Sequence, residues 1–446
     1  MISGWVNRIL SCVLRSFSLA LIFFLMTAEA CGAGIDETAG KAARIDALVS
    51  LYEKYGYING AVLLAEHGKI VYEKGIGYAN IESRTPNTPR TKFGIASITK
   101  QFTAVLVLQQ VAEGRIRLET KITEYLPWYR KDTGERMTVE QLIHHTSGLP
   151  PDFDSPEFSD SEAAGRHYEP QEFAQKFCQQ NLQSEPGTKW EYSNCGYDLL
   201  GLILEGVTGK SFGELLQERL LSPLGMKDTG VDHNDLPQRG GASGYVRHAG
   251  PRYTAGPYID RAHIFAAGAM YSTVEDLFLW SRALSDSGWL PKDIRDPIFR
   301  AGINDWGYGW FITKIPPGEP GAGGTLEEMR DDMPGNFFSW ILRYPQRDGV
   351  IIVLRNAYGS TEGLEQNLQA ILFNQEPRMP ARNLKDVLAR AWQLPEEWAV
   401  SHRAFSMLIF LLLLTLIWHM ARRGKDLREI VGSLSHSDAD RSRRKS

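Results

Sequence analysis

Two short segments of the chain hold side chains that together could activate a serine hydroxyl. They are Ser97–Lys100 (SITK) and Tyr192–Asn194 (YSN). If the first segment opens a helix, Ser97 and Lys100 lie one turn apart on the same face, with an amine near a hydroxyl. If the second is extended, Tyr192 and Asn194 point the same way, because side chains alternate along a strand. A serine, a lysine and a tyrosine around one cleft make a nucleophilic site that needs no histidine.

Each of these four residues has an expected role in acyl transfer. Ser97 would be the nucleophile, and its backbone N–H, at the positive end of a helix, would stabilise an oxyanion. Lys100 would help to remove the hydroxyl proton, and Tyr192 would pass that proton to the leaving group. Asn194 would orient the lysine and a substrate amide. The alternatives are structural: a helix-starting serine, a surface lysine, a packed tyrosine and a capping asparagine.

The flanks of these segments favour the catalytic interpretation. Besides residues 93–100 (FGIASITK), the informative segments are 142–149 (LIHHTSGL), Pro186-Gly187 before Tyr192, 223–226 (PLGM) and 267–273 (AGAMYST). Together they resemble the serine β-lactamase and penicillin-binding-protein superfamily, in the branch of class C β-lactamases, D,D-peptidases, D-aminopeptidases and esterases. The resemblance covers nearly all of residues 45–373. It implies catalytic roles for Ser97, Lys100, Tyr192 and Asn194, and structural roles for His144 and His145.

One family motif departs from this pattern. The superfamily has Lys or His, any residue and then Gly on a strand that faces the nucleophile, shortly before Pro334-Gly335 in this chain. The candidates are Met329-Arg330-Asp331 and the earlier 322–324 (AGG), and neither supplies Lys or His. The backbone oxyanion donor of that strand is expected to survive, but the cation for a substrate carboxylate is not, unless Arg330 replaces it. Hydrolysis of β-lactams is therefore the family activity with least support.

The elements around the motifs predict an α+β fold. Strand patterns lie at both ends of the body, over 61–65, 70–72, 337–342 and 350–354, with turns at 66–68 and 345–348. Helical patterns cover 41–55, 98–113, 194–205, 211–221 and 364–373. We expect an antiparallel sheet completed by both ends, flanked by helices and a helical subdomain, within a domain over 31–375. The resemblance implies the same β-lactamase/transpeptidase-like fold.

The two ends of the chain predict export and membrane attachment. Arg8 and Arg15 precede an apolar run that ends in residues 28–30 (AEA), so residues 1–30 form a predicted signal peptide, with lipidation of Cys31 as an alternative. Residues 404–420 are apolar and long enough to span a bilayer, although a buried core helix is the alternative. Residues 376–403 would be a linker and 421–446 a cytoplasmic basic tail, with the catalytic domain on the periplasmic side.

Composition excludes other classes of function. The net charge is −4 and the basic residues are dispersed outside the tail, so no nucleic-acid partner is expected. No C-x-x-C or H-E-x-x-H motif is present, so neither a metal nor a cofactor is expected.

Cys178 and Cys195 would form a disulfide or stay as two buried thiols. The acidic segment 152–162 would be a solvated rim of the cleft or would help to choose cationic substrates.

The sequence thus predicts an exported, membrane-tethered serine hydrolase that forms an acyl-enzyme on Ser97. Its substrate would be a small peptide, amide or ester, for example a peptide that contains a D-amino acid. A carboxylesterase with broad acyl tolerance is one alternative. A catalytically inactive, penicillin-binding-like sensor of peptide or peptidoglycan is another, and a β-lactamase is the third. The sequence makes no prediction of the oligomeric state.

Overall fold

The structure is a computed structural model that describes residues 40–151, 166–248, 252–256, 260–333, 337–358 and 363–378. All of them belong to one compact unit, residues 1–381. The predicted signal peptide, Cys31, the acidic segment, the transmembrane segment, the basic tail and nearly all of the linker lie outside the described residues. Within the described ranges, no helix is both long and apolar enough to cross a membrane.

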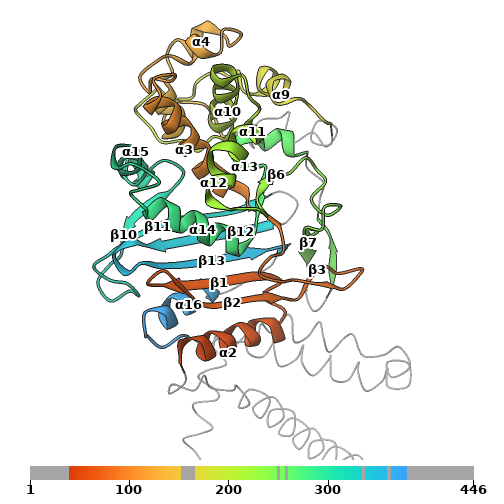
Figure 1. Cartoon of the computed structure of the whole chain (residues 1–446). Coiled ribbons are helices and arrows are strands. Elements are labelled where there is room, and N and C mark those ends of the chain that lie inside the picture. Colours follow the sequence, from red (N-terminus) through yellow and green to blue (C-terminus); the bar gives the residue numbers. More distant parts are fainter. Residues whose placement is uncertain are drawn as a thin grey trace, which may run out of the picture. The chain divides into compact units, whose positions relative to one another are not determined.

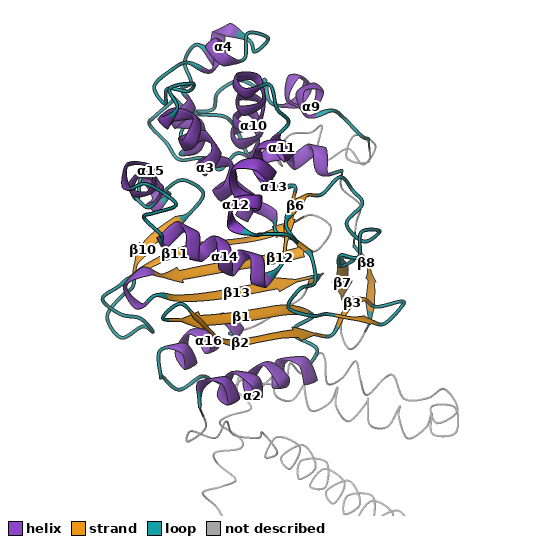
Figure 2. Ribbon diagram, viewed as in Figure 1, coloured by secondary structure: helices purple, strands orange, loops and turns teal. Residues whose placement is uncertain are grey.

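The main sheet has six strands among the described residues, and every neighbouring pair is antiparallel. Their order is β10-β11-β12-β13-β1-β2 (Figure 2). The strands are β1 (Gly60–Glu66), β2 (Lys69–Ile76), β10 (Phe311–Lys314), β11 (Thr325–Met333), β12 (Phe337–Tyr344) and β13 (Gly349–Arg355). Because β1 pairs with β13, with Ala61 opposite Leu354, both ends of the body complete one sheet, as the sequence predicts.

The turns of this sheet follow from local sequence. His67 and Gly68 between β1 and β2 both have left-handed backbones, with φ of 52° and 69°. Two such residues make the tight turn whose twist matches that of the flanking strands. Between β12 and β13 lies a single turn of helix, η6 (Pro345–Arg347), followed by Asp348 with φ of 44°. Both turns lie where the sequence predicts them.

Helices cover both faces of the sheet. On one face lie α2 (Lys41–Lys54) and α16 (Leu364–Leu372), whose apolar residues pack on Val62, Leu64 and Val353 (Figure 1). The opposite face, with Leu63 and Leu354, belongs to a larger core that includes α14 (Val274–Ser285) and the helical region. Successive residues of β1 and β13 therefore enter different cores, which is why both strands read as continuous apolar runs.

The helical region contains the two segments with candidate catalytic residues. Its helices are α3 (Thr99–Ala112), α4 (Ile122–Tyr125), α5 (Lys131–Gly134), α6 (Val139–Ile143), α9 (Pro170–Phe177), α10 (Asn194–Thr208), α11 (Phe212–Leu216), α12 (Ser222–Leu224), α13 (Phe265–Gly268) and α15 (Lys292–Ile298). The first ten residues of α3 are buried, and Gly114 just beyond its end has φ of 73°. A left-handed glycine at this position ends the helix.

The smaller elements are short. They are β3 (Tyr78–Asn80), β4 (Thr85–Pro86), β5 (Phe93–Gly94), β6 (Gly230–Val231), β7 (Tyr245–Arg247), β8 (Tyr253–Ala255), β9 (Met270–Ser272), β14 (Ala357–Tyr358), η1 (Ala96–Ile98), η3 (Gln217–Leu221), η4 (Arg261–Ile264) and η5 (Ile303–Asp305). The helix predicted over 211–221 consists of α11 and the π-helical turn η3, and α12 follows directly after it. Pro223 lacks an N–H and its ring crowds the preceding turn, which explains the widened turn.

Candidate active site

Ser97 lies in η1, the single turn that leads into α3. Two hydrogen bonds hold the backbone just before it. The Ile95 N–H donates to the Met270 carbonyl over 2.9 Å, and the Ser339 hydroxyl donates to the Ile95 carbonyl over 2.7 Å. Ala96 has φ of 48°, a left-handed conformation that costs a residue with a Cβ about 1–2 kcal/mol. Such strain persists where the surroundings hold the chain firmly, so the position of Ser97 is strongly determined.

Lys100 has no exposed surface and contacts three oxygen atoms. Its Nζ lies 2.8 Å from Ser97 Oγ, 2.7 Å from Asn194 Oδ1 and 2.9 Å from the Ala267 carbonyl oxygen. An amide oxygen and a carbonyl oxygen can only accept hydrogen bonds, whereas a hydroxyl can also donate. Of these three partners, only Ser97 can therefore give a proton to a neutral Lys100. This arrangement is the one that a general base needs.

Tyr192 approaches the nucleophile from the other side. Its Oη lies 2.5 Å from Ser97 Oγ, and the Lys100 Nζ lies 4.8 Å from the centre of its ring. A phenol hydroxyl within hydrogen-bonding distance of the nucleophile is suited to move a proton between Ser97 and a leaving group. The structure thus brings Ser97, Lys100, Tyr192 and Asn194 together at hydrogen-bonding distances.

His145 supports this site through the Tyr192–Asn194 segment. Its ring packs against the Tyr192 ring, with 4.4 Å between centres, and its Nδ1 accepts a hydrogen bond from the Ser193 N–H over 3.1 Å. Complete burial, and then the charge of Lys100, hold the pKa of His145 well below its usual range. His145 is therefore a neutral group that positions the Tyr192–Asn194 segment, in agreement with the structural role that the resemblance implies.

The backbone around Asn194 differs from the extended segment considered in the sequence. Ser193 is extended, with φ of −139° and ψ of 123°, but Asn194 is the first residue of α10. The simple alternation of a strand is therefore the wrong reason for Tyr192 and Asn194 to converge. They converge because the chain turns into a helix at Asn194, which directs its amide oxygen to Lys100.

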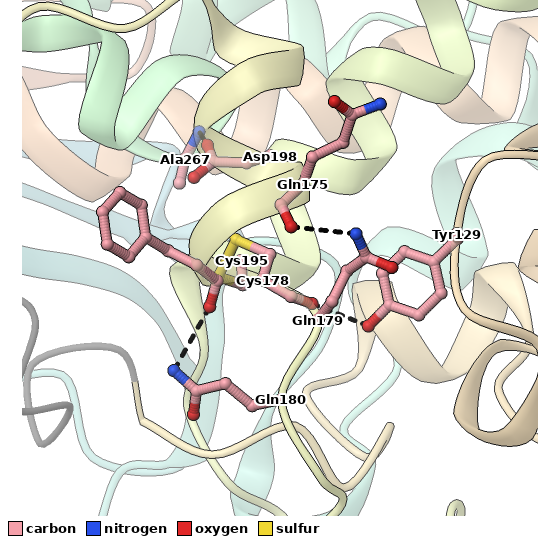
Figure 3. The surroundings of a disulfide bond; sticks show 9 residues. Tyr129, Gln175, Cys178, Gln179, Gln180, Cys195, Asp198 and Ala267 are labelled. Atoms are coloured by element: carbon pink, nitrogen blue, oxygen red, sulfur yellow. Dashed lines mark hydrogen bonds between the residues drawn. A yellow bond between two sulfur atoms is a disulfide. The ribbon is translucent and has the colours of Figure 1, made fainter.

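A disulfide fixes the start of α10. Cys195, next to Asn194, is bonded to Cys178, the residue just after α9, with 5.4 Å between the Cα atoms (Figure 3). The Tyr129 hydroxyl donates to the Cys178 carbonyl over 2.7 Å. Of the two alternatives that the sequence left open, the structure has the disulfide. Its position links α9 and α10 beside a candidate catalytic residue.

The strand β11 contains Met329-Arg330-Asp331, the segment that takes the place of the Lys/His-x-Gly motif, and its side chains alternate between two faces. On one face, Arg330 donates to Glu328 over 2.7 Å and to Glu365 of α16 over 2.5 Å. On the other face, Asp331 Oδ2 accepts a hydrogen bond from the Ser97 N–H over 3.1 Å. The alternative in which Arg330 replaces the motif's cation is therefore wrong, because its guanidinium lies on the far side of the sheet.

Asp331 is the residue of the site that the sequence did not single out. Its only signal was its position, since it stands where the resemblance leads us to expect glycine. A glycine there would leave the Ser97 N–H open to a substrate, whereas the carboxylate accepts a hydrogen bond from it. Met329, at the motif's cationic position, is 2% exposed and part of the core.

Known proteins resemble this chain in sequence over most of its length. The sequence model of the family described as Beta-lactamase matches residues 43–375. Protein flp of Staphylococcus aureus (strain MW2) is 29% identical over 325 residues, which are 70% of this chain and 62% of that protein. Penicillin-binding protein 4* of Bacillus subtilis (strain 168) is 29% identical over 364 residues, 75% of this chain and 77% of that protein. The chain thus spans about three fifths of the length of protein flp.

Solved structures share the fold. The octameric penicillin-binding protein homologue from Pyrococcus abyssi has a TM-score of 0.64 and 26% identity, over 75% of this chain and 78% of that one. D-amino acid amidase from Ochrobactrum anthropi SV3, complexed with L-phenylalanine amide, has a TM-score of 0.60 and 27% identity, over 74% of this chain and 97% of that one. From its matched residues, its fold and these relatives, the chain belongs to the beta-lactamase family, within the superfamily of serine β-lactamases and penicillin-binding proteins.

Proposed function

We propose that this protein is a serine hydrolase that cleaves an amide or an ester through an acyl-enzyme on Ser97. The observation that carries the proposal is the pair of contacts of Ser97 Oγ, 2.8 Å from Lys100 Nζ and 2.5 Å from Tyr192 Oη. A serine between a buried amine and a phenol is activated for attack on a carbonyl carbon. Family membership supports the same reaction class.

The reaction follows from these contacts. Lys100, in its deprotonated form, takes the hydroxyl proton while Ser97 Oγ bonds to the substrate carbonyl carbon. As the tetrahedral intermediate collapses, the bond to the leaving nitrogen or oxygen breaks, and Tyr192 delivers a proton to that atom. Lys100 then returns a proton to Tyr192. Water attacks the acyl-enzyme by the reverse sequence of proton transfers, which releases the carboxylic acid and restores Ser97.

The Ser97→Ala variant tests the proposal. The full-length protein is treated with a fluorophosphonate, and its intact mass is measured beside Ser97→Ala and the exposed-site control Ser83→Ala. One adduct on the native protein and on Ser83→Ala, absent from Ser97→Ala, is the expected result. An adduct of equal yield on Ser97→Ala would refute the nucleophile assignment. The melting temperature of Ser97→Ala should stay near that of the native protein, which shows that the loss is chemical.

One observation favours a second candidate, a catalytically inactive sensor that binds peptide or peptidoglycan. The Asp331 carboxylate already accepts the hydrogen bond of the Ser97 N–H, which an acyl-transfer enzyme uses for its oxyanion. The adduct experiment separates the two functions. A folded native protein that forms no adduct would favour the sensor.

For the hydrolase, the substrate class we propose is a small peptide or amide, including those that contain a D-amino acid. Two relatives support it by their names, a penicillin-binding protein and a D-amino acid amidase. A β-lactam with a free carboxylate is a poor candidate, because Arg330 lies on the other face of the sheet and Asp331 adds negative charge beside Ser97. Slow hydrolysis of a chromogenic cephalosporin, compared with a neutral ester, is the expected result.

We also propose that the protein is exported and tethered to the cell membrane by residues 404–420, with the catalytic domain on the periplasmic side. The support is the sequence pattern at the two ends of the chain. A reporter enzyme fused after Ser446 should be active only in the cytoplasm. Periplasmic activity of this fusion would overturn the proposed orientation.

A further inference from the structure

An acidic side chain occupies the place where the substrate's carbonyl oxygen must bind. Asp331 Oδ2 lies 3.1 Å from the Ser97 nitrogen and accepts its hydrogen bond. In acyl transfer, the negative charge of the intermediate develops on the carbonyl oxygen, and donors such as this N–H must point at it. The Asp331 carboxylate and that oxygen therefore compete for the same donor.

The position of Asp331 is built into the sheet. Its partner across the strand pair is Ser339 of β12, on the same face, and the Ser339 hydroxyl donates to the Ile95 carbonyl just before the nucleophile. The pairing of β11 with β12 therefore places Asp331 beside Ser97. The neighbouring Arg330 lies on the opposite face, where its guanidinium is paired with Glu328 and Glu365.

We propose that Asp331 selects substrates with a positive charge next to the scissile carbonyl, such as a free α-ammonium group. This inference rests on the proposed function and names the substrate class of the same site. An ammonium group can pair with the carboxylate and draw it away from the Ser97 N–H, which then becomes available to the oxyanion. A neutral substrate offers no such partner, and a substrate carboxylate is repelled, since like charges at short range oppose each other.

The test compares substrates that differ by one charge. Alanine p-nitroanilide, as both enantiomers, carries a free α-amine, and its N-acetyl derivative does not. For the native full-length protein we expect kcat/KM to be at least tenfold higher for the free amine. In Asp331→Ala this preference should fall at least tenfold, while hydrolysis of the neutral ester p-nitrophenyl acetate should become faster. Asp331→Asn, which keeps the shape and removes the charge, should lose the preference as well.

A matched control isolates the charge at the site. Glu328→Gln removes one negative charge from the same strand, but on the face towards α16, where Glu328 pairs with Arg330. It should leave the substrate preference unchanged. An unchanged preference in Asp331→Ala and Asp331→Asn, or a native preference for the acetylated substrate, would overturn the inference. Thermal denaturation of each variant shows that it is folded.

The fluorophosphonate reaction distinguishes failure of this inference from failure of the proposed function. The probe is uncharged at the reacting centre, so its rate with Asp331→Ala should exceed its rate with the native protein. If both react at the same rate and share one substrate preference, Asp331 is not a selector, although the hydrolase assignment stands. If neither reacts, the proposed function itself fails, and the inference fails with it.

Discussion

Removal of the Cys178–Cys195 disulfide should destabilise the protein by an amount that the structure lets us calculate. The two cysteines are 17 residues apart in sequence. By loop-closure entropy, cross-linking a loop of this size stabilises the folded chain by about 3 kcal/mol at 25 °C. The matched family region has 333 residues, and its unfolding entropy is about 2.1 cal/mol/K per residue. Loss of about 3 kcal/mol of stability should therefore lower the melting temperature of the reduced protein by roughly 4 °C.

The assay is calorimetry of matched forms of the protein. Cys178→Ala/Cys195→Ala is compared with the oxidised native protein and with native protein that was unfolded, reduced and refolded in a thiol reductant. The reduced form keeps both side chains, so its difference from the oxidised form isolates the cross-link. Because Cys178 is 1% and Cys195 5% exposed, the double variant should be destabilised further by loss of buried sulfur atoms.

The same perturbation has a readout at the candidate site. Cys195 directly follows Asn194, whose amide oxygen accepts a hydrogen bond from Lys100. Loss of the cross-link should loosen this contact and slow the reaction of Ser97 with a fluorophosphonate, even at temperatures where the protein is fully folded. A reduced protein with an unchanged melting temperature and an unchanged adduct rate would refute the reasoning on both counts.

Two further predictions concern Lys100 and His145. Lys100→Ala should slow adduct formation on Ser97 by about 10²–10⁴-fold, the usual contribution of a general base. Lys100→Arg should not restore the rate, because a guanidinium stays protonated. The rate is measured by intact mass against time, and a loss below tenfold would make Lys100 a structural residue. Burial holds the pKa of His145 below its usual value, so on acidification the unfolded chain binds a proton that the native chain does not. The contribution of His145 to the free energy of unfolding should therefore be fully present above about pH 6.5. Below that pH it should fall by up to about 1.4 kcal/mol per pH unit. In urea titrations between pH 7 and 5.5, His145→Gln should show a shallower fall than the native protein, and equal slopes would contradict this origin of the pH dependence.

The predictions that succeeded depend on local sequence. The hairpin turn at His67-Gly68 lies between two apolar runs, and the helix before Gly114 has an uninterrupted apolar pattern. Ser97 and Lys100 are neighbours because three residues make almost one helical turn. Each of these features is set within a few residues, so a single sequence is sufficient to read it.

The predictions that failed depend on contacts between distant segments. On β11 the acidic and basic residues follow one another, so side-chain chemistry does not indicate which face meets the nucleophile. Pairing with β12 decides which face that is, and a shift of one residue would place Arg330 instead of Asp331 beside Ser97. The start of α10 at Asn194 depends likewise on its packing in the helical region.

The sequence by itself determined which residues lie together at the candidate site, where the principal strands and helices lie and to which superfamily the chain is related. These features are written in residue types and short spacings, which physical chemistry connects directly to helices, turns and acyl transfer. Only the tertiary structure decided that Cys178 is bonded to Cys195 and that Asp331 accepts the hydrogen bond of the Ser97 N–H. Both contacts join segments that meet only after the chain has folded, and the second joins residues 234 positions apart.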